Sequence, residues 1–339
     1  MTEPAAEQPD VQDTDGASEG QELAPPTGIV VGVDGSDHGY CALRWAVREA
    51  KRRQRPLHLV TAYSVPIFAA SGLDGGFATV DDDLIRQGAQ AVIDQAVERI
   101  ADAGIDYDAR IEKGDASAVL LEFSLTAELL VFGSRGRGGF VGRLLGSVSS
   151  ALPGHAHCPT VTVPLKCAPR LDDAQPEAAQ LRPLITVGVD GSSQSRFAVL
   201  VAAEEAQRAG KELRIICAVP PLNTAVGWLP TPIDRNALFE EIETQLDAGR
   251  AWLSSHFPGL PISSELVDGV PIEVLIESSA SSELLVLGTR GHGGFAGMIL
   301  GSTTDGVLHH ARGPVMVVRD REDPRLADRG DFGPMLSYV

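Results

Sequence analysis

Residues 133–147, GSRGRGGFVGRLLGS, directly follow the apolar run ELLVF at 128–132. A short aliphatic run that ends in a glycine-rich loop is typical of a buried strand leading into a helix. The same arrangement returns at 283–302, where ELLVL precedes GTRGHGGFAGMILGS. Two copies in the same order indicate a duplicated domain rather than a chance cluster of glycines.

The rest of the chain supports the duplication, because IVVGVDGS at 29–36 returns as ITVGVDGS at 185–192. Apolar runs predict strands at 28–34, 56–63, 107–112, 128–132 and 159–163, and again at 184–190, 213–219, 263–267, 284–287 and 314–318. Amphipathic segments predict helices at 39–50, 81–103, 116–126 and from about 143, and later helices starting near 195, 234, 271 and 301. Strands that alternate with helices predict two tandem doubly wound α/β domains, each with a five-stranded parallel sheet.

Changes in amino-acid composition along the chain predict the domain boundaries. Residues 1–26 are acidic and proline-rich, which predicts a disordered arm. The domains are expected at 27–165 and 184–319, with a linker at 166–183 and a loose polar tail at 320–339. A glycine-containing loop is expected at 71–79.

The net charge and the apolar runs exclude several classes of protein. A formal charge of −18 over 339 residues argues against a nucleic-acid surface, which needs clustered Lys and Arg. No apolar run approaches the ~18 residues of a membrane helix, and the N-terminus does not resemble a signal peptide, so we expect a cytoplasmic protein without membrane contact. Four cysteines occur at spacings that match no metal or redox motif.

A small anion is the ligand class that the glycine loops predict. In a doubly wound sheet, ligands bind beyond the carboxyl ends of the strands where the strand order reverses, so Asp34 and the loop from Gly133 should face one crevice. Backbone N–H groups in such a loop, and at a helix starting near Gly146, can hold phosphate. Asp190 and the loop from Gly288 repeat the arrangement.

The remaining motifs each have a structural and a functional interpretation. A single glycine loop is often a tight turn without a ligand, but the duplication favours binding. His155 and His157 fit a helix end better than a metal site, and Ser36 and Ser192 fit helix N-caps better than nucleophiles. The basic cluster at 51–55 fits the negative end of a helix dipole.

The sequence resembles the universal stress protein family, ATP-binding type, through VGVDGS at 31–36, ALRWA at 42–46 and two copies of G-x2-G-x9-G-[ST]. The resemblance covers both halves and implies an ATP site in each, with or without Mg2+. The implied first site comprises Gly32, Asp34, Ala62, Gly133, Ser134, Arg135, Gly136, Arg137, Gly138, Gly139, Arg143, Gly146, Ser147 and Val148. The implied second site comprises Gly188, Asp190, Ala218, Gly288, Thr289, Arg290, Gly291, His292, Gly293, Gly294, Gly301, Ser302 and Thr303.

The chain departs from the family pattern at Glu128 and Glu283, where the family often has Asp, and at Gly39, where it often has Ser. The two sites also differ in charge, because the positions of Arg135, Arg137 and Arg143 are held in the second half by Arg290, His292 and Met298. We therefore expect the second site to hold a triphosphate less strongly.

Three functions remain open at this level. The first is a nucleotide-dependent regulator of a stress or growth response, without catalysis, which acts on a protein partner. The second is an ATP hydrolase or phosphotransferase that uses the same pocket, and the third is an interaction scaffold that does not need ATP. Family members commonly dimerise, so a homodimer is expected, and the strands at 160–164 and 315–318 are candidate edges through which the two halves pair.

Overall fold

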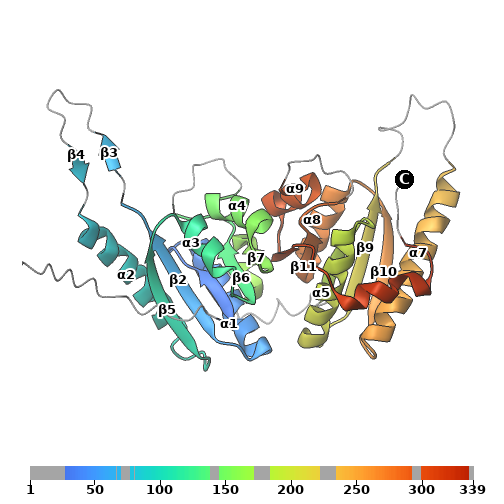
Figure 1. Cartoon of the computed structure of the whole chain (residues 1–339), viewed down its shortest axis with the longest axis horizontal. Coiled ribbons are helices and arrows are strands. Elements are labelled where there is room, and N and C mark those ends of the chain that lie inside the picture. Colours follow the sequence, from blue (N-terminus) through green and yellow to red (C-terminus); the bar gives the residue numbers. More distant parts are fainter. Residues whose placement is uncertain are drawn as a thin grey trace, which may run out of the picture.

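The computed structural model describes residues 27–65, 67–69, 77–79, 81–137, 145–171, 184–221, 234–291 and 299–335. The predicted arm at 1–26 and the linker beyond residue 171 lie outside these ranges. Figure 1 shows two α/β halves joined side by side.

The first half alternates strands and helices as predicted. Its elements are β1 (Ile29–Gly32), α1 (Asp37–Arg53), β2 (Leu57–Tyr63), α2 (Asp82–Glu98), β5 (Tyr107–Lys113), α3 (Ala116–Phe123), β6 (Leu129–Gly133), α4 (Ser147–His155) and β7 (Thr160–Val163). A 3-10 helix, η1 (Leu165–Leu171), follows β7.

The second half repeats this order. Its elements are β8 (Leu184–Val189), α5 (Ser193–Ala209), β9 (Leu213–Val219), α7 (Arg235–His256), β10 (Ile262–Asp268), α8 (Pro271–Ser281), β11 (Ser282–Gly288), α9 (Ser302–His310) and β12 (Val315–Val318). A 3-10 helix, η3 (Pro324–Phe332), follows β12.

The strands form one ten-stranded sheet in the order β10-β9-β8-β11-β12-β7-β6-β1-β2-β5. In this sheet every neighbouring pair that lies within one half is parallel, which confirms the predicted fold class. The two half-sheets meet where β12 pairs antiparallel with β7, with Met316 opposite Val161. The expectation that the halves pair through these edge strands is therefore confirmed.

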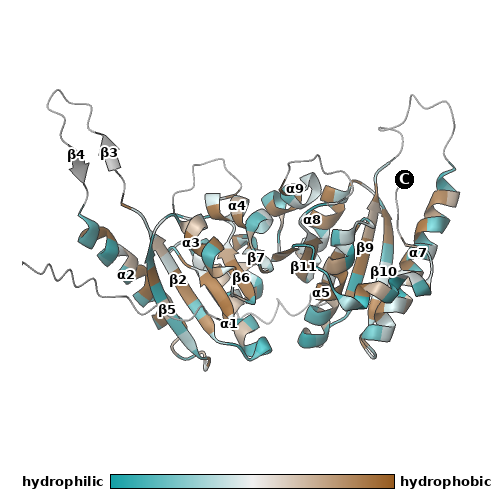
Figure 2. Ribbon diagram, viewed as in Figure 1, coloured by the Kyte–Doolittle hydropathy of each residue, from teal (hydrophilic) through white to brown (hydrophobic). Residues whose placement is uncertain are grey.

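Alternating strand residues supply cores on both faces of the sheet, as expected where helices cover both. Ile29 and Val31 point into a core that α1, α2, α5 and α7 close and that runs through both halves. Val30 points to the opposite face, under α3 and α4, and Leu285 lies under α8 and α9. The central strands are the most hydrophobic, whereas the outer strands β5 and β10 carry more polar residues (Figure 2).

Side-chain caps define where several helices begin. The hydroxyl of Ser36 accepts a hydrogen bond from the N–H of Gly39, and Ser192 accepts one from Ser195, which confirms the capping role predicted for both serines. Asp115 caps α3 and Asp234 caps α7 in the same way.

Three local predictions were wrong. The loop expected at 71–79 includes strand β4 (Phe77–Thr79), which pairs antiparallel with β3 (Ile67–Ala69). The helix start near Gly146 is confirmed, whereas the start at about 143 is wrong, because α4 begins at Ser147 after an extended Gly146 with φ of −80° and ψ of 171°. The loose tail expected after residue 319 contains η3, which packs on α7 and buries Arg329.

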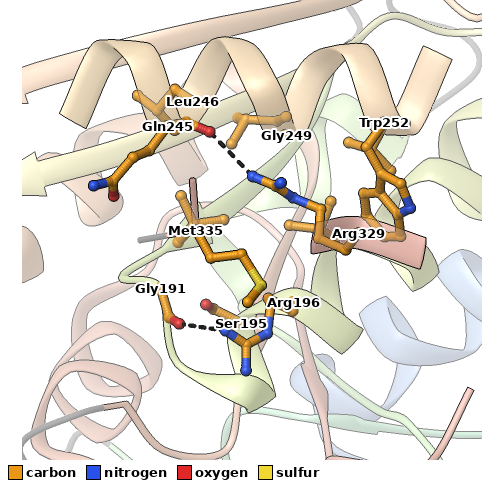
Figure 3. A pocket seen from close by; sticks show the side chains of 13 residues that line it. Gly191, Ser195, Arg196, Gln245, Leu246, Gly249, Trp252, Arg329 and Met335 are labelled. Carbon is orange, nitrogen blue, oxygen red and sulfur yellow. Dashed lines mark hydrogen bonds between the residues drawn. The ribbon is translucent and has the colours of Figure 1, made fainter. Parts of the chain in front are cut away.

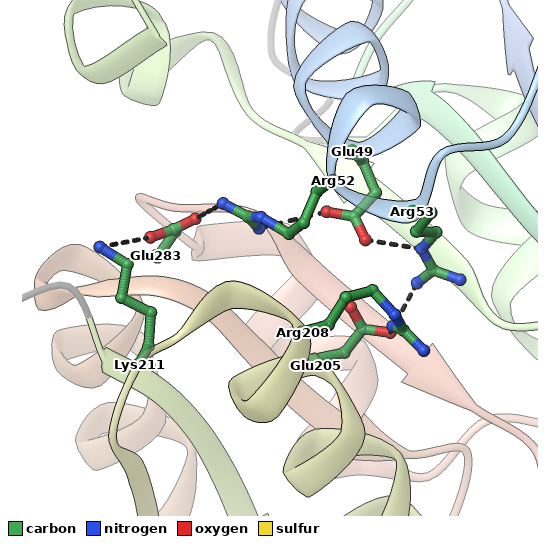
Figure 4. Close-up of polar contacts among 7 residues, drawn as sticks. All are labelled: Glu49, Arg52, Arg53, Glu205, Arg208, Lys211 and Glu283. Atoms are coloured by element: carbon green, nitrogen blue, oxygen red, sulfur yellow. Dashed lines mark hydrogen bonds and ion pairs between the residues drawn. The ribbon is translucent and has the colours of Figure 1, made fainter.

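A network of ion pairs crosses between the halves (Figure 4). Arg53 of α1 bridges Glu49 at 2.6 Å and Glu205 of α5 at 2.5 Å, and both carboxylates are at least 95% buried. Arg52 pairs with Glu283. The basic cluster lies in the last turn of α1 as predicted, but two of its arginines also link the halves, which the sequence did not indicate.

Candidate functional site

A cavity of about 280 Å³ opens at the carboxyl ends of β1 and β6 in the first half. β1 pairs with β2 on one side and β6 on the other, so the strand order reverses here, as the ligand rule for such sheets requires. The predicted residues that line it are Gly32, Asp34, Ala62, Gly133, Arg135, Gly136, Arg137, Gly146, Ser147 and Val148.

Asp34 ties the β1 loop to the glycine loop. One carboxylate oxygen accepts hydrogen bonds from the N–H and hydroxyl of Ser36, at 3.1 and 2.7 Å. The other accepts from the N–H of Arg137 at 2.7 Å. Asp34 therefore positions the glycine loop across the mouth of the cavity.

Glycine is required at two positions because the backbone approaches other groups closely. A Cβ at Gly133 would lie 2.6 Å from the carbonyl carbon of His38, and a Cβ at Gly136 would lie 2.7 Å from Asp34 Oδ2. Both distances are shorter than carbon contacts allow. The glycine loop can approach β1 and α1 this closely because Gly133 and Gly136 have no side chains.

The N-terminus of α4 borders the same cavity. The N–H of Gly146 donates to the carbonyl oxygen of Ser134 at 3.0 Å, and the Ser149 hydroxyl donates to that same oxygen at 2.7 Å. These bonds fix the start of α4, so that Ser147 and Val148 face the cavity. First-turn N–H groups and the positive end of the helix dipole favour an anion at this place.

The opposite part of the cavity is apolar, which the glycine motif did not reveal. The lining residues that were missed are Val33, Gly39, Val60, Ala116, Leu120, Phe132 and Ser149. Val60 and Phe132 belong to the core under α3 and α4. Their inward direction could have been deduced from the period of two along β2 and β6.

The second half holds a larger cavity, of about 470 Å³, at the carboxyl ends of β8 and β11. The predicted residues that line it are Gly188, Asp190, Ala218, Gly288, Arg290, Gly291, Gly301, Ser302 and Thr303. The missed lining residues are Val189, Ser195, Ile216, Val219, Pro220, Pro271, Leu275, Leu287 and Thr304.

The second site repeats the Asp–Ser bonds and the bond at the start of the helix, but its helix hydroxyl donates to the residue before the equivalent acceptor. Asp190 accepts from the N–H and hydroxyl of Ser192 at 3.0 and 2.7 Å. The N–H of Gly301 donates to the carbonyl oxygen of Thr289 at 2.8 Å, and the Thr304 hydroxyl donates to that of Gly288 at 2.8 Å. A Cβ at Gly291 would lie 2.0 Å from Asp190 Oδ2, so the glycine requirement is also repeated.

Two predicted residues, Ser134 and Thr289, do not line the cavities, and their hydroxyls contact side chains of α1 and α5 instead. The Ser134 hydroxyl is 3.0 Å from Nδ1 of His38, and the Thr289 hydroxyl donates to Oε1 of Gln194 at 2.7 Å. Burial and the charge of Arg135 lower the pKa of His38, although Asp34 opposes the shift. The first half therefore has a titratable group where the second half has a neutral amide.

The predicted residues Gly138, Gly139, Arg143, His292, Gly293 and Gly294 lie outside the described residues. Within the described ranges no group of three His, Cys, Asp or Glu side chains could hold a metal ion. Nδ1 of His155 lies 2.8 Å from the carbonyl oxygen of Ala151, at the end of α4.

A third cavity, of about 60 Å³, lies between α5, α7 and the C-terminal segment (Figure 3). It shares Val189 and Ser195 with the larger cavity of the second half. Arg329 donates to the carbonyl oxygens of Gln245 and Gly333, at 3.3 and 3.2 Å, and closes one side. The C-terminal segment is thus packed against the β8–α5 loop behind the second site.

The fold and the paired cavities define a class of tandem α/β proteins with one glycine-loop site at the carboxyl edge of each half-sheet. The model of the universal stress protein family matches residues 27–164 and 184–319. The chain therefore belongs to the universal stress protein family.

Relatives that align with both halves of the chain support this assignment. The chain is similar to the universal stress protein Rv2005c of Mycobacterium tuberculosis, with 36% identity over 296 residues that cover 86% of this chain and 97% of the relative. It is also similar to Rv2623 of the same organism, with 35% identity over 304 residues, 86% of this chain and 96% of the relative.

A solved structure shares the fold. The crystal structure of a universal stress protein from Archaeoglobus fulgidus superposes with a TM-score of 0.60 at 21% identity, covering 86% of this chain and 96% of that chain. None of the helices in the described ranges has the length and apolar character needed to span a bilayer.

Proposed function

We propose that each half binds one molecule of ATP and that the protein is a nucleotide-dependent regulator of a stress or growth response in the cytoplasm. The observation that carries the proposal is the convergence, in each cavity, of a glycine loop and a helix N-terminus at one end with an apolar surface at the other. A nucleotide has the same division into an anionic chain and an apolar base.

The first cavity fits this ligand at both ends. Val60, Leu120 and Phe132 give an apolar surface for the base, and Ala62 stands at the end of β2 beside it. Arg135 and Arg137 line the opposite end together with the start of α4. Charge-assisted hydrogen bonds contribute about 1.5–3 kcal/mol each, so a few of them supply micromolar affinity after ordering costs.

We expect Mg2+ to bind together with the triphosphate, not in a site built from protein ligands alone. Magnesium commonly keeps several waters and is bound through substrate phosphates and one or two carboxylates. Among the described residues, Asp34 and Asp190 are the carboxylates that line the two cavities. Both already accept hydrogen bonds from their own loops, so the role we propose for them is to hold the loops in place.

Binding, rather than turnover, is the activity we propose. Asp34 is the acidic residue that lines the first cavity in the described part of the chain, and both of its oxygens accept hydrogen bonds. A carboxylate so engaged is poorly placed to activate water as a general base. We infer that nucleotide occupancy changes the loops at the cavity mouths and thereby controls a protein partner.

Calorimetry with ATP on the full chain tests the proposal. We expect two molecules bound per chain, and one in each of the variants Gly136→Val and Gly291→Val, because the added side chain would occupy the space of Asp34 or Asp190. Lys51→Ala, at the exposed end of α1, is the matched control and should retain both sites. Absence of binding in the wild-type chain would refute the proposal.

A turnover assay separates the regulator from an enzyme. The purified chain is incubated with ATP and Mg2+, and released phosphate is followed over many equivalents. We expect the nucleotide recovered from the protein to remain ATP. Steady release that is lost in both valine variants would replace the regulator with an ATP hydrolase.

A further inference from the structure

We propose that Cys41 and Cys167 form a reversible disulfide that fastens η1 to α1 at the junction of the two halves. This inference is independent of nucleotide binding. It rests on the placement of two thiols from segments more than a hundred residues apart, which the fold brings together.

The two sulfur atoms are the starting point. Cys41 lies on α1 and Cys167 on η1, and their Sγ atoms are 3.9 Å apart. Both side chains are buried, and the Cys167 thiol donates to the carbonyl oxygen of Pro164 at 2.9 Å. A disulfide requires the sulfurs to approach to about 2.05 Å. The two sulfurs would therefore have to move about 2 Å closer, through side-chain rotation or a shift of η1.

The surroundings favour one thiol as the nucleophile. The side-chain hydrogen bond with Cys167, together with the charges of Arg44 and Arg170, lowers the pKa of Cys41 against the effect of burial. The hydrogen bond with Cys41 and burial raise the pKa of Cys167. Since the thiolate is the reactive form, Cys41 is the sulfur that attacks and Cys167 the sulfur that resolves.

The position of η1 gives the disulfide a structural consequence. Arg170, three residues after Cys167, donates to the carbonyl oxygens of Ala280, Ser282 and Arg312 in the second half, at 2.9–3.0 Å. Arg48 of α1 donates to the carbonyl oxygen of Arg170 at 3.1 Å. η1 thus contacts both halves, and a covalent bond to α1 would fix it in this position.

A hydroperoxide is the class of oxidant that completes the reaction. The Cys41 thiolate, with its proton, takes the terminal oxygen of the hydroperoxide, giving a sulfenic acid and releasing an alcohol, or water when the oxidant is hydrogen peroxide. The Cys167 thiol then displaces the sulfenic oxygen as water and the S–S bond forms. Two thiols are oxidised and one peroxide is reduced. Because both thiols are buried, the reaction follows local opening of η1.

The other cysteines provide internal controls. Cys158 and Cys217 are also buried, and the thiol pair that the structure shows is Cys41 with Cys167. Burial raises the pKa of Cys158 to about 12, which disfavours its thiolate. Oxidation should therefore be confined to the pair on α1 and η1.

Peptide mapping of the folded full-length chain tests the proposal. Reduced protein is treated with hydrogen peroxide, remaining thiols are alkylated, and the digest is analysed by mass spectrometry. We expect a linked peptide pair containing Cys41 and Cys167, lighter than the reduced pair by two hydrogen atoms and separated again by dithiothreitol. Cys158→Ser and Cys217→Ser should retain the link, and Cys41→Ser and Cys167→Ser should abolish it.

Three outcomes would overturn the proposal. One is a linked pair that includes Cys158 or Cys217. Another is oxidation of Cys41 to sulfinic acid with no linked peptide. The third is no reaction of the folded chain under conditions that link the thiols after denaturation. Circular dichroism of the serine variants confirms that they are folded, so loss of the link reports on the thiols themselves.

Discussion

The two halves of the chain share a fold and a hydrogen-bonding plan but differ in their sites. Asp34 and Asp190 hold equivalent loops, yet the first cavity is about 280 Å³ and the second about 470 Å³. Arg135 and Arg137 line the first cavity. In the described part of the chain, Arg290 is the cation that lines the second cavity. Duplication therefore preserved the framework while the groups that face the ligand diverged.

The contact between the halves is asymmetric as well. Glu49 and Glu205 are equivalent residues near the ends of α1 and α5, but Arg53, which bridges them, corresponds to Ala209. Arg53 therefore links two buried carboxylates across the junction, while Arg52 also pairs with Glu49 and Arg208 with Glu205. Such an arrangement fixes how the halves sit together, because neither carboxylate can be buried alone without cost.

The largest expected effect comes from Arg53→Ala, which would leave Glu49 with Arg52 at 3.2 Å and Glu205 with Arg208 at 2.7 Å but would break both ion pairs of Arg53 at the junction. A hydrogen bond to a charged group contributes about 1.5–3 kcal/mol, so the loss should be at least of this size. Urea denaturation at neutral pH should show a loss of this size. Lys51→Ala, in the same turn but exposed, is the control and should change stability little.

The pH dependence of that loss sharpens the test. Burial, with the nearby charge of Glu49, raises the pKa of Glu205, while Arg53 lowers it. Without Arg53 the folded chain binds a proton more readily than the unfolded chain does, so stability falls as pH rises through the pKa of the folded state. The deficit of Arg53→Ala should therefore shrink on acidification, and a deficit that grows would contradict the assignment.

The same glycine substitution in both halves tests the equivalence of the two loops. A Cβ at Gly133 would lie 2.6 Å from backbone atoms of His38, but at Gly288 the nearest atom is the Gln194 Cβ at 3.1 Å. Gly133→Ala should cost about 1–3 kcal/mol and weaken the first site, because backbone must move. Gly288→Ala should cost less. If Gly133→Ala and Gly288→Ala lost equal stability in thermal denaturation and equal affinity in calorimetry, the two loops would be equivalent and the prediction wrong.

The charge difference predicts unequal affinity for the triphosphate. We expect the first site to bind ATP more tightly than the second, and Arg137→Ala to weaken it roughly 10-fold, which is about 1.4 kcal/mol. Affinity for adenosine should change little, because Arg137 is at the polar end of the cavity. Titration of ATP and adenosine into the variant separates the two contributions. A similar loss for both ligands would show that the loop, not the charge, had been disturbed.

The smallest effect is expected from His38→Gln, which places the residue of the second half in the first. The lowered pKa of His38 means that the unfolded chain binds a proton more readily, so stability falls as pH drops below about 6.5. Glutamine removes this contribution while it can still contact Ser134. The difference in unfolding free energy between variant and wild type should favour the variant increasingly at acidic pH. A constant difference would contradict the role of His38.

Much of the candidate site could be predicted from short sequence motifs. The glycine loops, Asp34 and the start of α4 could be predicted because each depends on residues close in sequence that need a particular backbone. Leu120 and Leu275 were missed, although they line the apolar parts of the cavities. Their contribution depends on where α3 and α8 lie over the sheet, which no short motif encodes.

The sequence by itself determined the duplicated order of strands and helices, because apolar periodicity and glycine positions act over a few residues. Only the tertiary structure decided the antiparallel register in which β7 and β12 join, the arginine that links Glu49 and Glu205, and the docking of η3 on α7. These contacts link residues far apart in the chain. Their partners are selected by packing and by the cost of burying charge, so they appear only once the chain is folded.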